Sequence, residues 1–304
     1  MNDAAIAAPP PSTSTQSSYV RPVTIFTIPV DRDIIFSNHK GIYKKQVETR
    51  QRHLIVKSTF INPFLHTGEF IRCITTCCSP VSEIERDLTG PAFLYFKRAF
   101  LIFTDRRVLH IPTRFNRSPR GAISQIEYKH CERLDIHNRS LMVQYKNGKR
   151  EFFSHISRLE KRKLRSLISD LHFSPGKPEQ LHTRSYLCPG CTRILTPEAK
   201  ICVGCKLAFK RLLKAGLWTF LIPGGVFFYF RYLLAGFAAA GFEVALIAFA
   251  VFHWVEINKG LSIDWGLAVF ATCGWIIVKL ISFFYARQFV HEFVPEEKEF
   301  SFAK

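Results

Sequence analysis

Acidic residues are scarce in this 304-residue chain, and the motifs of common enzyme classes are missing. Lys and Arg number 42 against 24 Asp and Glu, which gives a formal net charge of +18. The sequence has no Gly-rich phosphate loop, no G-x-S-x-G elbow and no His-Glu metal helix. Its isolated Asp and Glu residues form no pair that spacing brings together for acid/base chemistry. We therefore expect a protein that is not an enzyme.

The first 20 residues, MNDAAIAAPPPSTSTQSSYV, have little apolar surface. They lack the basic start and the apolar core of a secretory signal. Because small polar and Pro-rich sequence cannot offset the entropy of ordering, we predict a disordered tail over residues 1–20. An N-terminal extension over residues 21–52 follows, in which VTIFTIPV is either an added strand or an extended arm.

The cysteines do not suit a disulfide scaffold. There are nine of them, an odd number, and Cys77 and Cys78 are adjacent. This usage indicates a reducing compartment. Four are expected to be small hydrophobic residues of a strand-rich core, namely Cys73, Cys77, Cys78 and Cys131. A second metal site from His130, Cys131 and His137 is an alternative, although its spacing matches no established pattern.

Short apolar runs broken by turn signals dominate the middle of the chain. Residues 53–60 (HLIVKSTF) and 69–76 (EFIRCITT) are predicted strands, rich in β-branched residues. Residues 99–112 predict a hairpin with a Thr-Asp-Arg turn. Residues 140–156 predict a second hairpin, because Asn147-Gly148 tolerates the positive φ angles of a type I′ turn.

One amphipathic helix is predicted immediately after these strands. Ser157 and Glu160 have the spacing of a capping box, in which each side chain satisfies a backbone donor of the other. A single apolar stripe follows, formed by Leu164, Leu167, Ile168 and Leu171. The predicted fold class is therefore α+β.

The order of these elements resembles the bacterial pleckstrin-homology-like, or GRAM-like, domain. FTDRR at 103–107 and IEY at 126–128 carry most of the resemblance, which covers residues 53–173. It implies a β-sandwich or barrel closed by a C-terminal helix, and a role in binding lipid headgroups or proteins. The cations that would contact an anionic lipid or a partner are Arg106, Arg107, Arg114, Arg117, Arg120, Lys161, Arg162 and Lys163.

Two C-x-x-C hooks follow a linker at 174–185. Cys188, Cys191, Cys202 and Cys205 supply four soft sulfurs, which complete a tetrahedral structural zinc site, so zinc is the expected cofactor. His182 is a possible replacement ligand. The run CPGCTRILTPEAKICVGC resembles the short zinc-ribbon family over residues 186–210. That family usually has Gly after each hook, whereas this chain has Thr192 and Lys206, so we expect less regular knuckle geometry.

Residues 212–290 are nearly free of charge and predict a membrane domain. Two apolar segments, 232–254 and 265–286, each exceed the ~20 residues that cross a bilayer. A third, 218–230, is shorter and contains Pro-Gly-Gly, so two or three transmembrane helices are expected. The stretch LIPGGVFFYFRYLLAGF resembles the start of a small bacterial membrane-hairpin domain. A C-terminal tail follows at 291–304.

Charges next to and inside this domain indicate how it is oriented. Residues 101–214 contain 24 Lys or Arg against nine Asp or Glu. By the positive-inside rule, the N-terminal domains face the cytoplasm of a bacterial inner membrane. The membrane-proximal basic residues are Lys206, Lys210, Arg211 and Lys214. Glu243 and Lys279 are the ionisable residues within the membrane segments and are expected to pair between helices.

Together these patterns predict a multi-domain, multi-pass membrane protein acting as an adaptor, sensor or scaffold. Its expected partners are a protein or anionic lipid headgroups, and Gly236, Ala240 and Gly241 permit close helix packing or a homo-oligomer. Nucleic acid is disfavoured, because Tyr186 and Phe209 are few aromatic residues for base stacking. A membrane-tethered nucleic-acid-binding ribbon and a small transporter or channel component remain alternatives.

Overall fold

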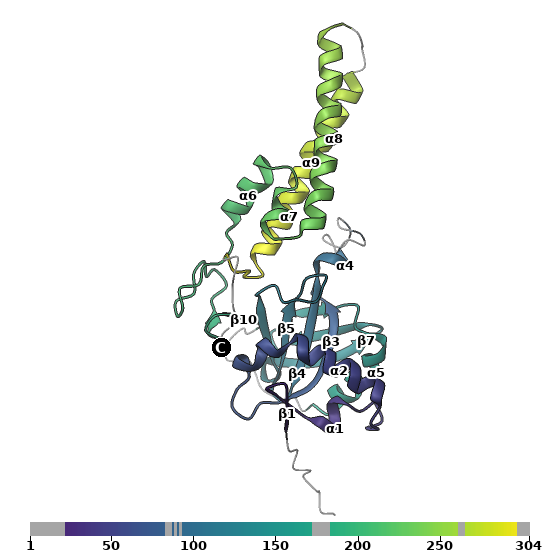
Figure 1. Cartoon of the computed structure of the whole chain (residues 1–304), viewed down its shortest axis with the longest axis vertical. Helices are drawn as coiled ribbons and strands as arrows, with labels where there is room; N and C mark the ends of the chain where they lie inside the picture. Colours follow the sequence, from purple (N-terminus) through teal and green to yellow (C-terminus); the bar gives the residue numbers. More distant parts are fainter. Residues whose placement is uncertain are drawn as a thin grey trace, which may run out of the picture.

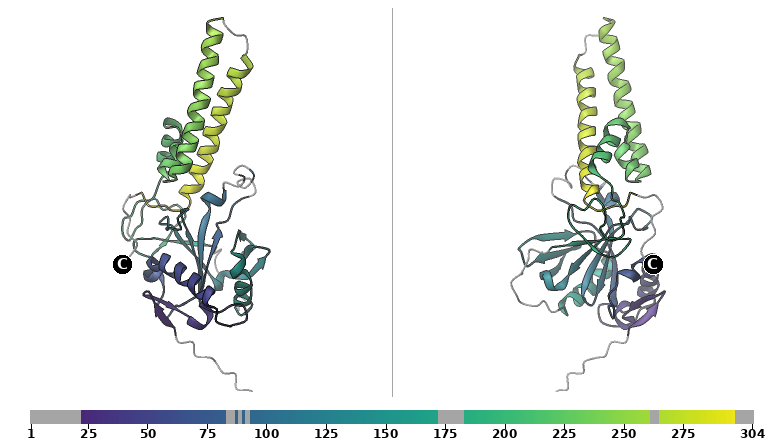
Figure 2. Two further views of the ribbon diagram at one scale, coloured as in Figure 1. Left: turned by 45° about the vertical axis from the view of Figure 1, so that its right-hand side comes forward. Right: turned by 90° about the vertical axis from the view of Figure 1, so that its left-hand side faces the viewer.

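The computed structural model describes residues 22–82, 87, 90, 93–171, 183–260 and 265–296. The predicted tail at 1–20, most of the linker, His182 and residues 297–304 lie outside this described part. A β-rich region occupies one end of the molecule, and a long helical hairpin projects from it (Figure 1). Figure 2 shows the same division from two other sides. The α+β class is confirmed by this arrangement.

Most strands belong to one large sheet. Adjacent strands within this sheet are antiparallel, except that β2 and β3 pair in parallel through Val30 and Ile71. The N-terminal hairpin is therefore an added pair of strands. In spatial order the sheet consists of β1 (Val23–Ile25), β2 (Ile28–Val30), β3 (Ile71–Cys78), β4 (Arg98–Thr104), β5 (Arg107–Pro112), β6 (Ile123–Glu127), β10 (Ser185–Leu187) and β11 (Ile194–Leu195).

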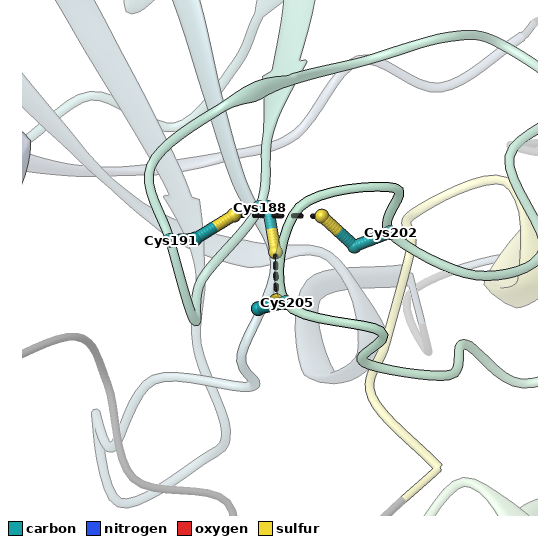
Figure 3. A group of neighbouring side chains, drawn as sticks. All are labelled: Cys188, Cys191, Cys202 and Cys205. Carbon is teal, nitrogen blue, oxygen red and sulfur yellow. Dashed lines mark hydrogen bonds between the residues drawn. The ribbon is translucent and has the colours of Figure 1, made fainter.

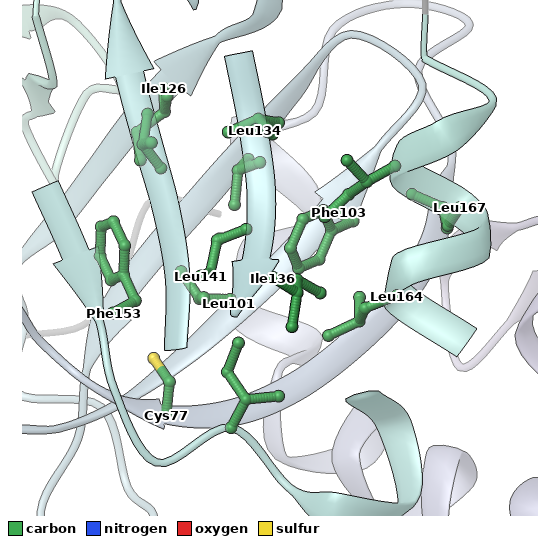
Figure 4. Close-up of a cluster of buried hydrophobic side chains, with 14 of the residues drawn as sticks. Cys77, Leu101, Phe103, Ile126, Leu134, Ile136, Leu141, Phe153, Leu164 and Leu167 are labelled. Atoms are coloured by element: carbon green, nitrogen blue, oxygen red, sulfur yellow. The ribbon is translucent and has the colours of Figure 1, made fainter. Parts of the chain in front are cut away.

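A second, three-stranded sheet faces the large one. It contains β7 (Cys131–His137), β8 (Ser140–Tyr145) and β9 (Arg150–Phe153), and η3 (Tyr128–His130) precedes it. Helix α5 (Arg158–Ser169) packs against β7. Leu101, Leu141 and Leu164 come from the two sheets and from α5, and they share one buried cluster (Figure 4). The two predicted hairpins and the predicted helix are confirmed, but the turn at Asn147-Gly148 is not type I′, because Gly148 has a positive φ angle and Asn147 does not.

The apolar residues of β4 are buried on both faces of the large sheet. Leu101 and Phe103 point into the cluster beneath α5, whereas Phe100 and Ile102 point into a second cluster on the opposite face. Successive side chains of a strand alternate between faces, so a strand buried on both sides needs a continuous apolar run. The second cluster is covered by α1 (Arg32–Ile35), α2 (Lys45–Lys57) and η1 (Thr59–Phe64).

The strand predicted at 53–60 is wrong, because these residues form the end of α2 and the start of η1. Gln51, Leu54, Ile55 and Ser58 are buried at helical spacing. The Gln51 amide donates to the Ile74 carbonyl at 2.9 Å and accepts from the Ile74 N–H at 3.2 Å. It thereby satisfies backbone groups of β3 as a neighbouring strand would. The domain boundary expected at residue 53 consequently falls inside a helix.

The expected capping box at the start of α5 is also wrong. Ser157 occupies the N-cap position, but its side chain makes no capping hydrogen bond. Glu160 is buried instead, where it accepts from the Thr75 hydroxyl at 2.5 Å and from the Gln51 amide at 3.2 Å. Its Oε1 also lies 3.0 Å from Arg50 Nε. Because Glu160 has these partners in the core, it does not turn back to the helix end.

Among the described residues, two helices are long and apolar enough to cross a membrane: α8 (Leu233–Asn258) and α9 (Trp265–Val290). The shorter apolar segment forms α6 (Leu212–Leu221) and α7 (Gly225–Tyr229). Gly224 has φ +63° at the break, and a Cβ on Gly225 would lie 1.8 Å from the Trp218 carbonyl oxygen. The Pro-Gly-Gly sequence therefore makes a tight reversal that a side chain would prevent.

The end of α9 returns to the β-rich domain. Phe96, in α4 (Phe93–Phe96), packs against Phe227, Tyr285 and Phe289. The Tyr232 hydroxyl donates to the Phe96 carbonyl at 2.9 Å. We call this junction the helix base. It fixes one end of the helical hairpin against one end of the large sheet (Figure 1).

Candidate metal centre and cationic sites

The four cysteines of the two hooks converge at one point. Their sulfur atoms all lie within 4.8 Å of one another. Cys188 and Cys205 have sulfurs 3.4 Å apart, as do Cys191 and Cys202 (Figure 3). A tetrahedron of thiolates about 2.3 Å from a metal ion has edges of about 3.8 Å. The residues therefore fit a four-sulfur metal site, and this part of the sequence prediction is confirmed.

The two knuckles have the same backbone geometry. Thr192 and Lys206 adopt φ angles of +62° and +57°. Their N–H groups donate to the carbonyls of Cys188 and Cys202 at 2.8 and 2.9 Å. The expected irregularity is therefore wrong, because both residues adopt the left-handed conformation that Gly would take.

Backbone donors in the second knuckle stabilise a thiolate. Burial raises the pKa of the Cys202 thiol, but the N–H groups of Cys205 and Gly204, together with hydrogen bonds from the Cys188 and Cys191 thiols, bring this pKa to about 7. A thiolate is the form that binds metal.

The ribbon is built onto the large sheet. Strand β10 pairs with β6, so the ribbon continues the sheet edge. On its other side, Phe209 contacts Phe293 with ring centroids 5.6 Å apart. The Lys210 N–H donates to the Val294 carbonyl at 3.0 Å, and the Glu296 N–H donates to the Ala208 carbonyl at 2.9 Å. Residues after α9 therefore form part of the ribbon's support, although we expected a separate tail.

Three of the cations proposed for ligand contact are internal, and the first two are Arg107 and Lys163. Arg107 is 3% exposed and bonds Glu69 through Nη2 at 2.7 Å and through Nε at 2.9 Å. Lys163 is buried and donates to the Ile35 carbonyl at 2.7 Å. Both predictions are corrected: the long aliphatic stems lie in the core, and each charged head has an internal partner.

Arg120 is the third internal cation. Its Nη1 lies 2.6 Å from Glu292, and its guanidinium stacks over Tyr232 at 4.8 Å. Lys97 approaches the same carboxylate at 3.4 Å. Burial raises the pKa of Glu292, but Arg120 and Lys97 outweigh it and lower this pKa below its usual value. Arg120 therefore joins the sheet to the end of α9 and is not available to a partner.

Arg107→Gln is expected to lower the free energy of unfolding by about 3–5 kcal/mol, because it leaves Glu69 buried without its cation. Arg106→Gln, which removes the neighbouring exposed cation, is the matched control and should change stability by about 0.5 kcal/mol or less. Denaturant unfolding followed by hydrogen exchange over β4 and β5 gives the comparison. Equal effects of the two substitutions would contradict the assigned burial.

The remaining candidate cations do not form one surface. Arg106 lies at the β4–β5 turn, at the end of the sheet opposite the helix base, and Lys161 and Arg162 lie on α5. Arg114 and Arg117 lie in the β5–β6 loop. Of these last two, Arg114 lies close to the helix base, near Arg231 and Tyr232, whereas Arg117 lies beside residues of β3 and α2.

Aromatic contacts hold the β5–β6 loop at the helix base. Phe115 is 61% exposed, and Arg98 stacks over its ring at 4.6 Å. Tyr95 lies between Phe115 and Tyr232, at 5.9 Å from each ring. Burial and the nearby Arg231 lower the pKa of Arg114. Cations thus gather beside an exposed aromatic residue.

Three of the four membrane-proximal basic residues are exposed: Lys206 and Arg211, which precede α6, and Lys214, which lies in its first turn. Lys210 is the exception, because it is buried and donates to the Tyr229 carbonyl. Burial and then Arg231 lower its pKa to about 7. The prediction of Lys210 as a surface cation is corrected, since its ammonium group lies over the Tyr229 ring at 4.5 Å.

Glu243 and Lys279 meet between α8 and α9. Lys279 Nζ lies 2.7 Å from Glu243 Oε2, and both side chains are buried. The same ammonium donates to the Thr219 carbonyl at 2.6 Å and approaches the Ile222 carbonyl at 3.4 Å. Lys279 therefore also satisfies carbonyl groups at the C-terminal end of α6.

Sequence reasoning missed four residues around the junction of sheet, ribbon and α9: Lys97, His110, Arg184 and Glu292. Arg184 was assigned to a linker, and Glu292 to a tail. A lone His within an apolar strand and a lone carboxylate after a long apolar helix were the available signals. Neither indicates its partner, because the partners are distant in sequence.

No protein-family model matches the chain, and no curated protein sequence matches it. A solved structure, the C-terminal domain of an unknown protein from Leishmania infantum, overlaps 38% of this chain and 95% of that domain. The identity is 16% and the TM-score is 0.26. A score this low does not establish a shared fold.

Proposed function

We propose that this chain is a non-enzymatic, membrane-anchored adaptor, sensor or scaffold whose β-rich domain rests on an anionic lipid surface. The observation that carries the proposal is the position of the β5–β6 loop. Arg114 and the exposed Phe115 lie at the helix base, beside Arg231 and Tyr232, and the exposed Arg117 belongs to the same loop. An exposed aromatic residue among cations suits the boundary between headgroups and acyl chains.

The topology we propose has two membrane crossings. Lys210 precedes α6, and Val294 follows α9, yet their backbones are hydrogen-bonded. Both ends of the helical region therefore belong on one side, and α6 and α7 enter without crossing. Because the basic residues lie on that side, we assign it to the cytoplasm of a bacterial inner membrane.

Zinc is the metal we propose for the cysteine cluster, since four thiolates in a closed shell are typical of structural zinc. It would stiffen the ribbon between the sheet and the helices. The pleckstrin-homology-like resemblance is supported by two facing sheets and a C-terminal helix around one core. The N-terminal strands and α2 are additions to that pattern.

Hydrogen exchange in lipid nanodiscs tests the lipid contact. Amides at 113–119 are expected to exchange at least about threefold more slowly in discs containing phosphatidylglycerol than in discs of phosphatidylcholine alone, and added salt should reduce the difference. Arg114→Glu with Arg117→Glu should abolish it. Arg106→Glu with Arg162→Glu makes the same charge change away from the helix base and should preserve it. Equal exchange of the wild-type loop in both lipids would contradict the proposal.

A further inference from the structure

A cavity of about 190 Å³ lies where the large sheet, strand β10 and the end of α9 meet. Polar side chains from all three line it, among them Ser79, His110, Ser124, Arg184, Gln288 and Glu292. Its volume is below the ~300–1,000 Å³ of sites for drug-sized ligands. The cavity therefore suits a small polar group.

Arg184 is the lining cation with the weakest internal contacts. Its Nη1 lies 3.5 Å from His110 Nδ1, its Nη2 lies 3.3 Å from the Tyr186 hydroxyl, and its Nε lies 3.7 Å from Glu151. Within the described part of the chain, Nε has no hydrogen-bond partner although it is buried. Charge-assisted hydrogen bonds of a guanidinium are normally about 2.7–2.9 Å long. Arg184 thus lines the cavity without a short hydrogen bond to any described residue.

The charge around the cavity is positive overall. Lys97 and Arg120 both contact Glu292, and Arg184 has Glu151 as its distant counter-charge. Three cations therefore face two carboxylates among these five residues. Glu151 also accepts a hydrogen bond from the Tyr145 hydroxyl at 2.9 Å, so its negative charge is shared between Tyr145 and Arg184. An anion bound near Arg184 would balance the group.

His110 prepares a second donor. Burial, followed by the charge of Arg184, lowers the pKa of His110 well below its usual 6.5, so the ring is neutral and carries one N–H. Nδ1 lies 2.9 Å from the Ser124 hydroxyl and 3.5 Å from Arg184 Nη1, and because a guanidinium can only donate, we assign Nδ1 as the acceptor. Nε2 therefore donates to Ser79 Oγ at 2.8 Å. The hydroxyl proton of Ser79 is then available to a ligand.

We propose that this cavity binds a phosphate group, held by the Arg184 guanidinium and the Ser79 hydroxyl. A fork of N–H donors on one side of the His110 ring and a hydroxyl donor on the other match the several acceptor oxygens of a phosphate. Gln288 and Glu292 belong to the end of α9, so the cavity lies at the level of the helix base. Both a lipid headgroup and free inorganic phosphate can supply this chemistry.

Titration of the delipidated full chain in detergent with inorganic phosphate tests the site. Arg184→Gln should weaken binding about 10–100-fold, and Ser79→Ala by roughly threefold to tenfold. Arg106→Gln, which removes an exposed cation elsewhere, should change affinity by less than about twofold. Arg184→Lys keeps the positive charge but loses the paired N–H donors of the guanidinium, so its phosphate affinity should lie between those of wild type and Arg184→Gln. Unchanged metal content and an unchanged circular dichroism spectrum would show that the weaker binding comes from the lost contact and not from misfolding.

Native mass spectrometry distinguishes the two sources of phosphate. Retention of phosphatidylglycerol by wild type but not by Arg184→Gln assigns a lipid headgroup, whereas phosphate binding without lipid retention assigns the free ion. Acetate binding as tightly as phosphate, or no Arg184-dependent binding of either phosphate or lipid, overturns the proposal. The loop exchange at 113–119 does not involve Arg184, so failure here leaves the proposed function separately testable.

Discussion

Cys202→Ser is expected to remove the metal from the chain and to unfold the ribbon. Metal content should fall from about one ion per chain to below about 0.1. A structural zinc site contributes an apparent ~10–16 kcal/mol, and a short ribbon cannot bury enough apolar surface to replace it. Cys202 is buried beside Phe209 and Phe293, so the loss should extend to residues 293–296, which lie against the ribbon. Elemental analysis and hydrogen exchange measure the two effects.

Cys273→Ser is the matched control for this prediction. Cys273 is an exposed cysteine of α9 that lies outside the cluster, so its replacement should leave metal content unchanged. Exchange over residues 208–210 and 293–296 should rise in Cys202→Ser and not in the control. Full metal content in Cys202→Ser, or an ordered ribbon in metal-free wild type, would contradict the assigned role.

Features with a local signal could be predicted from the sequence. The Asn147-Gly148 hairpin, the cysteine hooks and the two long apolar helices each follow from a pattern that is contained within a short segment. The helix α2 lacked such a signal. Leu54 and Ile55 are as typical of a strand as of a helix, and the decisive side chain, Gln51, is polar and buried. Its burial depends on unpaired backbone groups of β3, which the sequence of α2 does not contain.

The internal cations could not be predicted for the same reason. Arg107 pairs with Glu69, 38 residues earlier, and Arg120 pairs with Glu292, 172 residues later. Neither composition nor local sequence pattern distinguishes a buried Arg that pairs with a carboxylate distant in sequence from an exposed Arg. Arg106 and Arg107 show the limit most clearly, since adjacent residues with the same side chain lie on the surface and in the core.

Glu243→Gln and Lys279→Met are each expected to lower the free energy of unfolding in bicelles by about 3–5 kcal/mol. Each leaves the other charge buried without its partner, which is costly in the interior and in a bilayer. Lys279→Met should have the larger effect, because Lys279 also bonds the Thr219 carbonyl of α6. Unfolding in bicelles with increasing dodecyl sulfate gives both values. Glu256→Gln, on the same helix but partly exposed, is the control and should cost about 0.5 kcal/mol or less.

The double variant separates the ion pair from the carbonyl contacts. If the pair is the main interaction, Glu243→Gln with Lys279→Met should cost at least about 2 kcal/mol less than the sum of the single variants, because no unpaired charge remains. The loss of unfolding free energy that remains in the double variant then measures the hydrogen bond from Lys279 to α6. Hydrogen exchange at residues 219–222 should rise in both variants that lack Lys279. Additive single effects would show that Glu243 and Lys279 act independently, and the packing of α6 against α9 would then need another explanation.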